Sequence, residues 1–244
     1  MTSTRPPGSA AVREPAVDGR RAAVRDGLGV GVAVGVSGLA FGAAAITAGL
    51  SVAQTAVLSL LAFTGASQFA LVGVIGGGGG LAAGTLGAVL LGGRNALYGL
   101  RLASALDVRG WRRLLTAQVV IDETTAVATA QQGRAAMRAG FYSAAVTLYA
   151  MWNLTTLLGA VGAARLGDPE TLGLDVIGPA VFLALLWPRL TSARAPDGAR
   201  GQVGVAAAAM AIAVAATPVL PPGVPVMLAA VTALPALLSR KADR

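Results

Sequence analysis

The sequence predicts an all-α protein, a polytopic bundle of transmembrane helices, and three observations predict it. The chain of 244 residues is 55% hydrophobic and only 12% charged, which is too apolar for a soluble domain of ordinary composition. No charged side chain occurs within 27–93, 139–164 or 201–239, and each stretch is long enough to span a bilayer at least once. These stretches are unbroken blocks of Ala, Leu, Val and Gly, which favours helices over alternating strands.

The two ends of the chain differ from its middle. The first 26 residues carry five arginines among prolines, glycines and three acids, and this composition predicts a disordered cytoplasmic tail over 1–26. A single transmembrane domain is expected over 27–239, and a short basic cytoplasmic tail over 240–244. No soluble domain is inserted between the apolar stretches.

The apolar part of the chain divides into segments of membrane-spanning length. Each crossing needs about 20 residues, and Gly, Pro and Asp turns mark the junctions. Eight apolar segments result, and we expect six to eight of them to cross: 28–50, 52–76, 81–104, 114–130, 141–164, 174–188, 202–217 and 222–239.

Basic residues predict the orientation, because cytoplasmic loops retain Lys and Arg. If all eight segments cross, thirteen basic residues lie inside and five outside, and four of those five crowd one external loop. If 52–76 and 114–130 each enter and leave on the same side, the count becomes seventeen against one, with Arg94 left in the membrane. Six full crossings then remain, with the N-terminus inside.

Both segments contain features of a broken or re-entrant helix. Segment 52–76 is interrupted by Gly65, Ala66, Ser67 and Gln68, and segment 114–130 is short and carries two acids. Irregular backbone at membrane depth is tolerated where it is buried in protein or lines a cavity. We therefore expect helix breaks in these two segments.

Asp122 and Glu123 are the leading functional candidates. A carboxylate at the centre of a membrane helix costs about 2.5 to 3.5 kcal/mol on insertion scales, so something must offset it. Either the segment does not span and both acids reach water, or they form an ion pair at depth. Adjacent side chains of a helix point about 100° apart. One acid is therefore expected to have a structural role and the other to face a cavity.

Arg94 is the natural partner for one of these acids. It lies inside segment 81–104 next to Asn95, and Tyr98 and Arg101 follow on its own helix face. We expect Arg94 to pair with an acid of 114–130. Such intramembrane pairs mark substrate pathways but also hold bundles together, and the sequence leaves both roles open.

Two further polar motifs lie within apolar segments. Gly65, Ser67 and Gln68 suit a helix break whose exposed amides face a carboxylate ligand, although small residues and Gln also serve ordinary helix packing. Asn153 lies in a polar patch with Trp152, Thr155 and Thr156. Packing and anchoring explain that patch well, except for Asn153.

The composition excludes several kinds of chemistry. The chain has no Cys and no His, which rules out disulfides, thiolate nucleophiles, Cys/His zinc sites and a Ser-His-Asp triad. No cofactor or metal is expected. The formal net charge is +8, but the arginines lie at the ends of apolar blocks as topology signals, so no nucleic-acid partner is expected.

Several motifs occur in an order that is typical of one family. They are Ala40-Phe41-Gly42, Ala48-Gly49-Leu50-Ser51, Gly65-Ala66-Ser67-Gln68-Phe69, Arg94 through Gly99, Asp122-Glu123-Thr124, Trp152 through Gly159, and Leu172-Gly173-Leu174-Asp175 leading to Pro179 through Leu185. In order and spacing they resemble the AzlC family, the large subunit of bacterial branched-chain amino-acid exporters, over about 28–240. One departure is Gly92-Gly93-Arg94-Asn95, where the family usually has Asn-x-Arg-His, so an amide replaces an imidazole.

The resemblance implies a multi-pass protein of the bacterial inner membrane that works with a small hydrophobic AzlD-type subunit. It would export leucine, isoleucine and valine, with methionine as a further candidate. We expect the substrate carboxylate near Gly65–Gln68 or Arg94, and its ammonium near Asp122 or Glu123. Protonation of one acid would couple export to the proton gradient. The alternatives are a passive channel, a non-transporting membrane scaffold, or a membrane-embedded enzyme using Asp122, Glu123 and Ser67.

Overall fold

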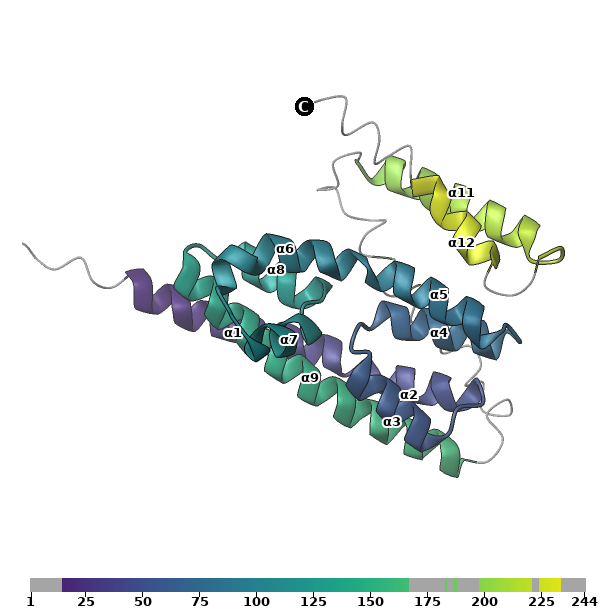
Figure 1. Cartoon of the computed structure of the whole chain (residues 1–244), viewed down its shortest axis with the longest axis horizontal. Coiled ribbons are helices and arrows are strands. Elements are labelled where there is room, and N and C mark those ends of the chain that lie inside the picture. The colour runs from purple at the N-terminus through teal and green to yellow at the C-terminus, as the bar shows by residue number, and fades with distance from the viewer. Residues whose placement is uncertain (1–14, 167–182, 184–186, 188–197, 221–223, 234–244) are drawn as a thin grey trace, which may run out of the picture.

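A computed structural model describes residues 15–166, 183, 187, 198–220 and 224–233 (Figure 1). Every regular element within these residues is a helix, as the sequence predicts. Most of segment 174–188, both ends of 222–239 (222–223 and 234–239) and the tail 240–244 lie outside the described residues. Two helical stretches, Gly19–Thr47 and Arg134–Arg165, are long and apolar enough to cross a membrane.

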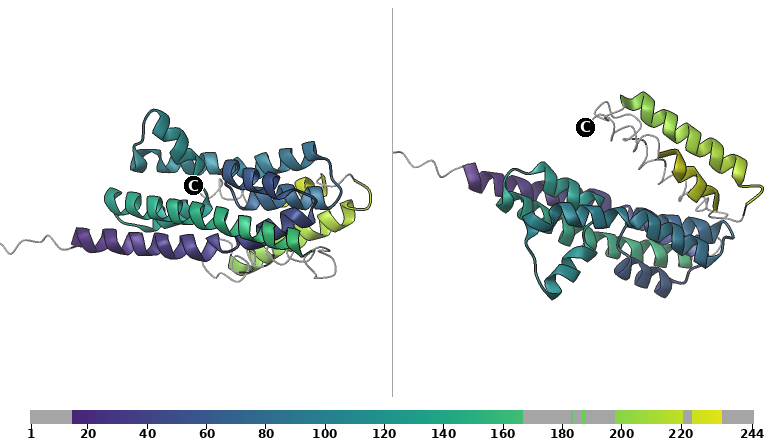
Figure 2. Two further views of the ribbon diagram at one scale, coloured as in Figure 1. Left: turned by 90° about the horizontal axis from the view of Figure 1, so that it is seen from below. Right: turned by 45° about the horizontal axis from the view of Figure 1, so that its top comes forward.

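The longest helix and the two N-terminal helices pack side by side along the length of the bundle. α1 (Pro15–Gly35) and α2 (Gly38–Thr47) follow one another across a short turn, and α9 (Arg134–Arg165) runs parallel alongside both (Figures 1 and 2). The turn is closed by the Ser37 hydroxyl, which donates to the Val34 carbonyl at 2.6 Å. The prediction of one unbroken segment over 28–50 therefore misses a break at residues 36–37.

Glycines bring these helices into backbone contact. Gly27, Gly31 and Gly35 recur at four-residue spacing and face α9, where a Cβ at Gly31 would lie 2.7 Å from the Cβ of Thr147. On α2, a Cβ at Gly42 would collide with the Thr156 carbonyl oxygen. Small residues at this spacing allow helices to approach closely enough for extensive van der Waals contact.

The prediction of a disordered tail over 1–26 is wrong for residues 15–26, which form the first turns of α1. The contact with α9 extends into this part of the helix. Ala23 is fully buried, and its carbonyl oxygen lies close to Gly140. Asp26 accepts a hydrogen bond from Gln131 at 3.2 Å. These contacts stabilise a helix that the charged composition alone disfavours.

Two helical hairpins enter the bundle from opposite ends (Figure 1). α3 (Val52–Leu61) and α4 (Ala66–Gly76) start and finish at the C-terminal end of α2, where a Cβ at Gly76 would lie 3.2 Å from the Cβ of Ala48. α7 (Trp111–Gln118) and α8 (Asp122–Ala130) start and finish at the other end. The predicted breaks in 52–76 and 114–130 are therefore present.

A further pair of helices connects the two hairpins. α5 (Leu81–Gly92) packs on α4, and α6 (Arg94–Leu106) continues from it after an interruption at Gly93 that the apolar pattern of 81–104 does not predict. The end of α6 is tied to the start of α9, because Arg134 donates to the Ser104 carbonyl at 2.7 Å.

The C-terminal elements form a separate antiparallel pair above α5 (Figure 1). α11 (Gly198–Ala216) packs on α12 (Val224–Ala230) and on the short 3-10 helix η3 (Val231–Ala233). α12 also contacts α5.

Two hydrophobic clusters form the interior. The first joins α2, α4 and α9 around Phe41, Phe69 and Trp152, whose ring centroids lie 5.3 to 6.3 Å apart. The second joins α6, α8 and α9 around Leu102, Ala128 and Phe141. Each cluster fixes one hairpin against α9.

The contact between α2 and α9 predicts that two glycines of α9, three residues apart, differ in how much their substitution by alanine changes the stability of the protein. A Cβ at Gly159 would collide with the Leu39 carbonyl oxygen, whereas a Cβ at Gly162 meets nothing within 4 Å. We expect Gly159→Ala to destabilise the protein by about 1 to 3 kcal/mol. Gly162→Ala should be neutral or slightly stabilising, because alanine favours the helix. Thermal unfolding of both variants in detergent measures this, and equal melting temperatures would contradict the close approach.

Candidate functional site

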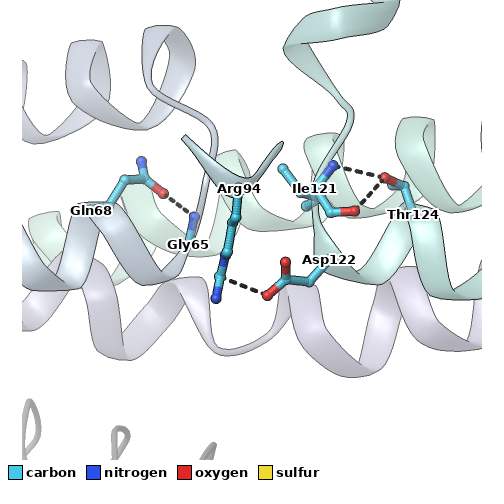
Figure 3. A network of polar contacts seen from close by, with 6 residues as sticks. All are labelled: Gly65, Gln68, Arg94, Ile121, Asp122 and Thr124. Carbon is cyan, nitrogen blue, oxygen red and sulfur yellow. Dashed lines mark hydrogen bonds and ion pairs between the residues drawn. The ribbon is translucent and has the colours of Figure 1, made fainter. Parts of the chain in front are cut away.

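The helix interruptions lie at one level, beside the middle of α9. Thr155 of α9 donates to the Gly35 carbonyl at the end of α1, at 2.6 Å. One and a half turns earlier, the Tyr149 hydroxyl donates to the Leu60 carbonyl at the end of α3, at 3.0 Å. The breaks before α4, α6 and α8 meet in the same region (Figure 3). The polar ends of half-helices are thus gathered inside the bundle.

Gln68 closes the break between α3 and α4. Gly65 has φ +58°, a left-handed value that glycine adopts at no steric cost. The Gly65 N–H donates to Gln68 Oε1 at 3.1 Å, and Gln68 Nε2 donates to the Leu58 carbonyl at 3.2 Å (Figure 3). The side chain is 1% exposed. Gln68 therefore satisfies backbone groups on both sides of the break.

Thr124 closes the break between α7 and α8 in the same way. Its hydroxyl accepts from the Ile121 N–H at 3.1 Å and donates to the Val119 carbonyl at 2.7 Å (Figure 3). Like Gln68 in α4, Thr124 is the third residue of its helix. Gln118 joins the tips of the two hairpins by donating to the Leu61 carbonyl at 2.7 Å. The two breaks are therefore held as one unit.

An ion pair connects the half-helices. Arg94 Nη2 lies 2.6 Å from Asp122 Oδ2, and the side chains are 33% and 19% exposed (Figure 3). The predicted pairing of Arg94 with an acid of 114–130 is present, and the acid is Asp122. Arg94 is the first residue of α6 and Asp122 the first residue of α8. The helix dipole disfavours a cation and favours an anion at these positions, so Asp122 compensates Arg94.

The pair is closed in this state of the protein. Its two charged groups are in direct contact, so a solute cannot lie between them. The Arg94 Nε is buried and has no hydrogen-bond partner among the described residues. This N–H can therefore donate to a further acceptor beside the pair.

The remaining predicted residues lie around the pair. Glu123 is half-buried in the second position of α8, and Asn95 is half-buried in the second position of α6. Tyr98 packs against the second hydrophobic cluster one turn further along α6. Ser67 is 7% exposed and faces the end of α5, where a Cβ at Gly92 would lie 3.2 Å from its Oγ.

Asn153 lies on α9 and holds α3 in place. Its Oδ1 accepts from the Ser59 hydroxyl at 2.8 Å, and its Nδ2 donates to the Tyr149 carbonyl at 2.8 Å. Gln68 and Asn153, which we predicted as substrate contacts, therefore use their polar atoms within the protein in this state.

Gln118 was not predicted to have a role, and Thr124 was predicted only as part of the Asp122-Glu123-Thr124 motif. A signal was present, because both are polar residues inside an apolar segment that also carries two acids. The hydrogen bonds that these two residues make depend on the conformation of the turn between α7 and α8, and the sequence alone does not specify that conformation.

Comparison with known proteins adds one finding. A family model described as AzlC protein matches residues 29–166. The match begins within α1 and ends just after α9, so it contains both hairpins, the ion pair and every predicted site residue. No curated protein and no solved structure matches the chain.

Proposed function

The chain belongs to the AzlC family, and from that premise we propose that it exports branched-chain amino acids across the bacterial inner membrane. AzlC is a family associated with membrane transport rather than with catalysis. The substrates proposed are leucine, isoleucine and valine, with methionine as a further candidate. A small AzlD-type membrane subunit is proposed as the partner, on the basis of the family.

The observation that carries the proposal is the Arg94–Asp122 pair among broken helices. A zwitterionic amino acid has one carboxylate and one ammonium group. When the ion pair opens, the substrate carboxylate can bind Arg94 and the substrate ammonium group can bind Asp122. The Arg94–Asp122 pair then has its two charges balanced both when empty and when loaded, which limits the electrostatic cost of either state at low dielectric.

The surroundings of the pair suit each part of such a substrate. The Nε of Arg94 offers a further donor for the carboxylate, and the N-terminus of α4 has no side-chain cap from Gly65, so its dipole favours an anion. Glu123, next to Asp122, offers a second acid for the ammonium. Ile121 belongs to the first hydrophobic cluster, which places an aliphatic and aromatic environment beside the charges.

The arrangement of the helices supports the topology with six full crossings. Segments 52–76 and 114–130 act as re-entrant hairpins in this proposal, one from each side. Arg20, Arg21 and Arg25 of α1 and Arg134 and Arg138 of α9 lie at the end where these two parallel helices begin, whereas Arg165 marks the opposite end. Large apolar side chains face outward, including Leu61, Leu100 and Val146 at 72%, 70% and 69% exposure, as expected for contact with lipid.

Cysteine labelling tests this topology, because the natural chain has no cysteine. With re-entrant hairpins, the α4–α5 loop is periplasmic and the α8–α9 loop is cytoplasmic. With eight crossings, both loops are cytoplasmic. We expect a membrane-impermeant maleimide to label Gly79→Cys in intact cells, and to label Gln132→Cys only after permeabilisation. Protection of both positions in intact cells would contradict the re-entrant arrangement.

Leucine counterflow in proteoliposomes tests the role of the ion pair. Arg94→Gln or Asp122→Asn leaves one charge without its partner, which should destabilise the protein by about 1 to 3 kcal/mol for a partly buried pair. The double variant restores neutrality and should recover folded yield. We expect counterflow to stay at least about tenfold below wild type in all three, because the zwitterion has lost its charged contacts.

The exposed pair Asp107–Arg109, whose charged atoms lie 4.0 Å apart, provides the matched control. Asp107→Asn with Arg109→Gln removes the same two charges and should leave counterflow within about twofold of wild type. Recovery of counterflow in the Arg94→Gln/Asp122→Asn variant would show that the pair serves structure alone. Unsaturable leucine flux in wild type would favour a channel, and no flux with or without the partner subunit would favour a scaffold.

Proton coupling is assigned to Glu123 in this proposal. Counterflow exchanges substrate without net proton movement, whereas gradient-driven transport requires the proton step. Glu123→Gln should therefore retain counterflow and lose accumulation driven by an imposed pH gradient, with normal amounts of folded protein. Full gradient-driven activity in this variant would remove Glu123 from the coupling step.

A further inference from the structure

A groove of about 850 Å³ lies between the first turns of α1 and the first turns of α9. Three arginines line it, Arg20 from α1 and Arg134 and Arg138 from α9, and all three are exposed. None of the lining residues that the structure describes is acidic. Neither Arg94 nor Asp122 lines the groove, and the proposed transport mechanism does not involve it.

The spacing of the lining residues gives the groove a charged end and an apolar end. On α1, Arg20 is followed at four-residue steps by Val24 and Leu28. On α9, Arg138 is followed two turns later by Val146. Because the two helices run parallel (Figure 2), their arginines lie side by side and so do their apolar residues.

The exposed lining residues indicate the chemistry of a ligand that would fit the groove. Leu28 is 46% exposed and Val146 69% exposed. Arg134 already donates one hydrogen bond to the Ser104 carbonyl, which holds its guanidinium in place while other N–H groups stay available. A ligand that matches the groove must carry a strong anion at one end and an aliphatic chain at the other.

We propose that this groove binds an anionic phospholipid of the cytoplasmic leaflet, with its phosphate against the three arginines and one acyl chain along Val24, Leu28 and Val146. The site rests on the proposed orientation, in which this end of the bundle faces the cytoplasm. Arginine binds phosphate through paired N–H groups. Basic pockets between membrane helices on the cytoplasmic side recognise anionic headgroups.

Native mass spectrometry of the purified full-length protein tests the proposal. The probes are phosphatidylglycerol and phosphatidylcholine with identical acyl chains, and glycerophosphoglycerol without chains. We expect wild type to retain phosphatidylglycerol in preference to the other two. Arg20→Gln with Arg138→Gln should weaken that retention by roughly 30-fold, since each arginine near an anionic lipid contributes roughly fivefold.

The matched control is Arg112→Gln with Arg113→Gln, which removes two arginines of α7 that do not line the groove. It should retain phosphatidylglycerol as wild type does. Equal retention of both lipids by wild type, equal loss in both double variants, or displacement by glycerophosphoglycerol would each overturn the proposal. So would a second copy of the chain occupying the groove in place of lipid. Leucine counterflow of the same preparations is scored separately, so failure of the lipid site and failure of the transport proposal are distinguishable.

Discussion

The backbone contact between α1–α2 and α9 is the constraint on which the rest of the bundle depends. Gly42 and Gly159 allow α2 and α9 to touch where any larger residue would collide with a carbonyl oxygen. In an environment where apolar side chains gain little by leaving the solvent, such close van der Waals packing is what holds helices together. α9 stays unbroken over 32 residues, and the interrupted helices are arranged against it. Its middle supplies Tyr149, Trp152 and Thr155 to the region where they break.

Helix breaks bring polar backbone into the interior, and each break must be satisfied locally. Gln68 and Thr124 do this with one side chain each, linking the half-helix before the break to the one after it. The third position of a helix is where a side chain can reach back to the N-cap N–H. With the backbone satisfied in this way, the side chains of Arg94 and Asp122 contact one another directly. A closed, neutral pair is a stable empty state for a site proposed to accept a zwitterion.

Much of the site could be predicted from residue types alone. Charged groups in apolar segments require partners, so the pairing of Arg94 with an acid followed from energetics, as did helix breaks near Gly65 and within 114–130. The choice of Asp122 over Glu123 did not follow, because it depends on where α8 begins. The breaks at 36–37 and at Gly93 were missed, since continuous hydrophobicity predicts a continuous helix. Residues 15–26 were assigned to a tail because composition cannot register the packing of Ala23 on α9.

The sequence by itself determined the helical class, the apolar segments, the absence of Cys and His chemistry, and the few polar groups that must be compensated. These follow from transfer free energies, which depend on residue type and on distance along the chain. Only the tertiary structure decided that Gln68 and Asn153 hold backbone and side chains within the protein, and that arginines of α1 and α9 line one groove. Those features depend on which helices touch and in which direction they run, and hydrophobic periodicity carries no information about either.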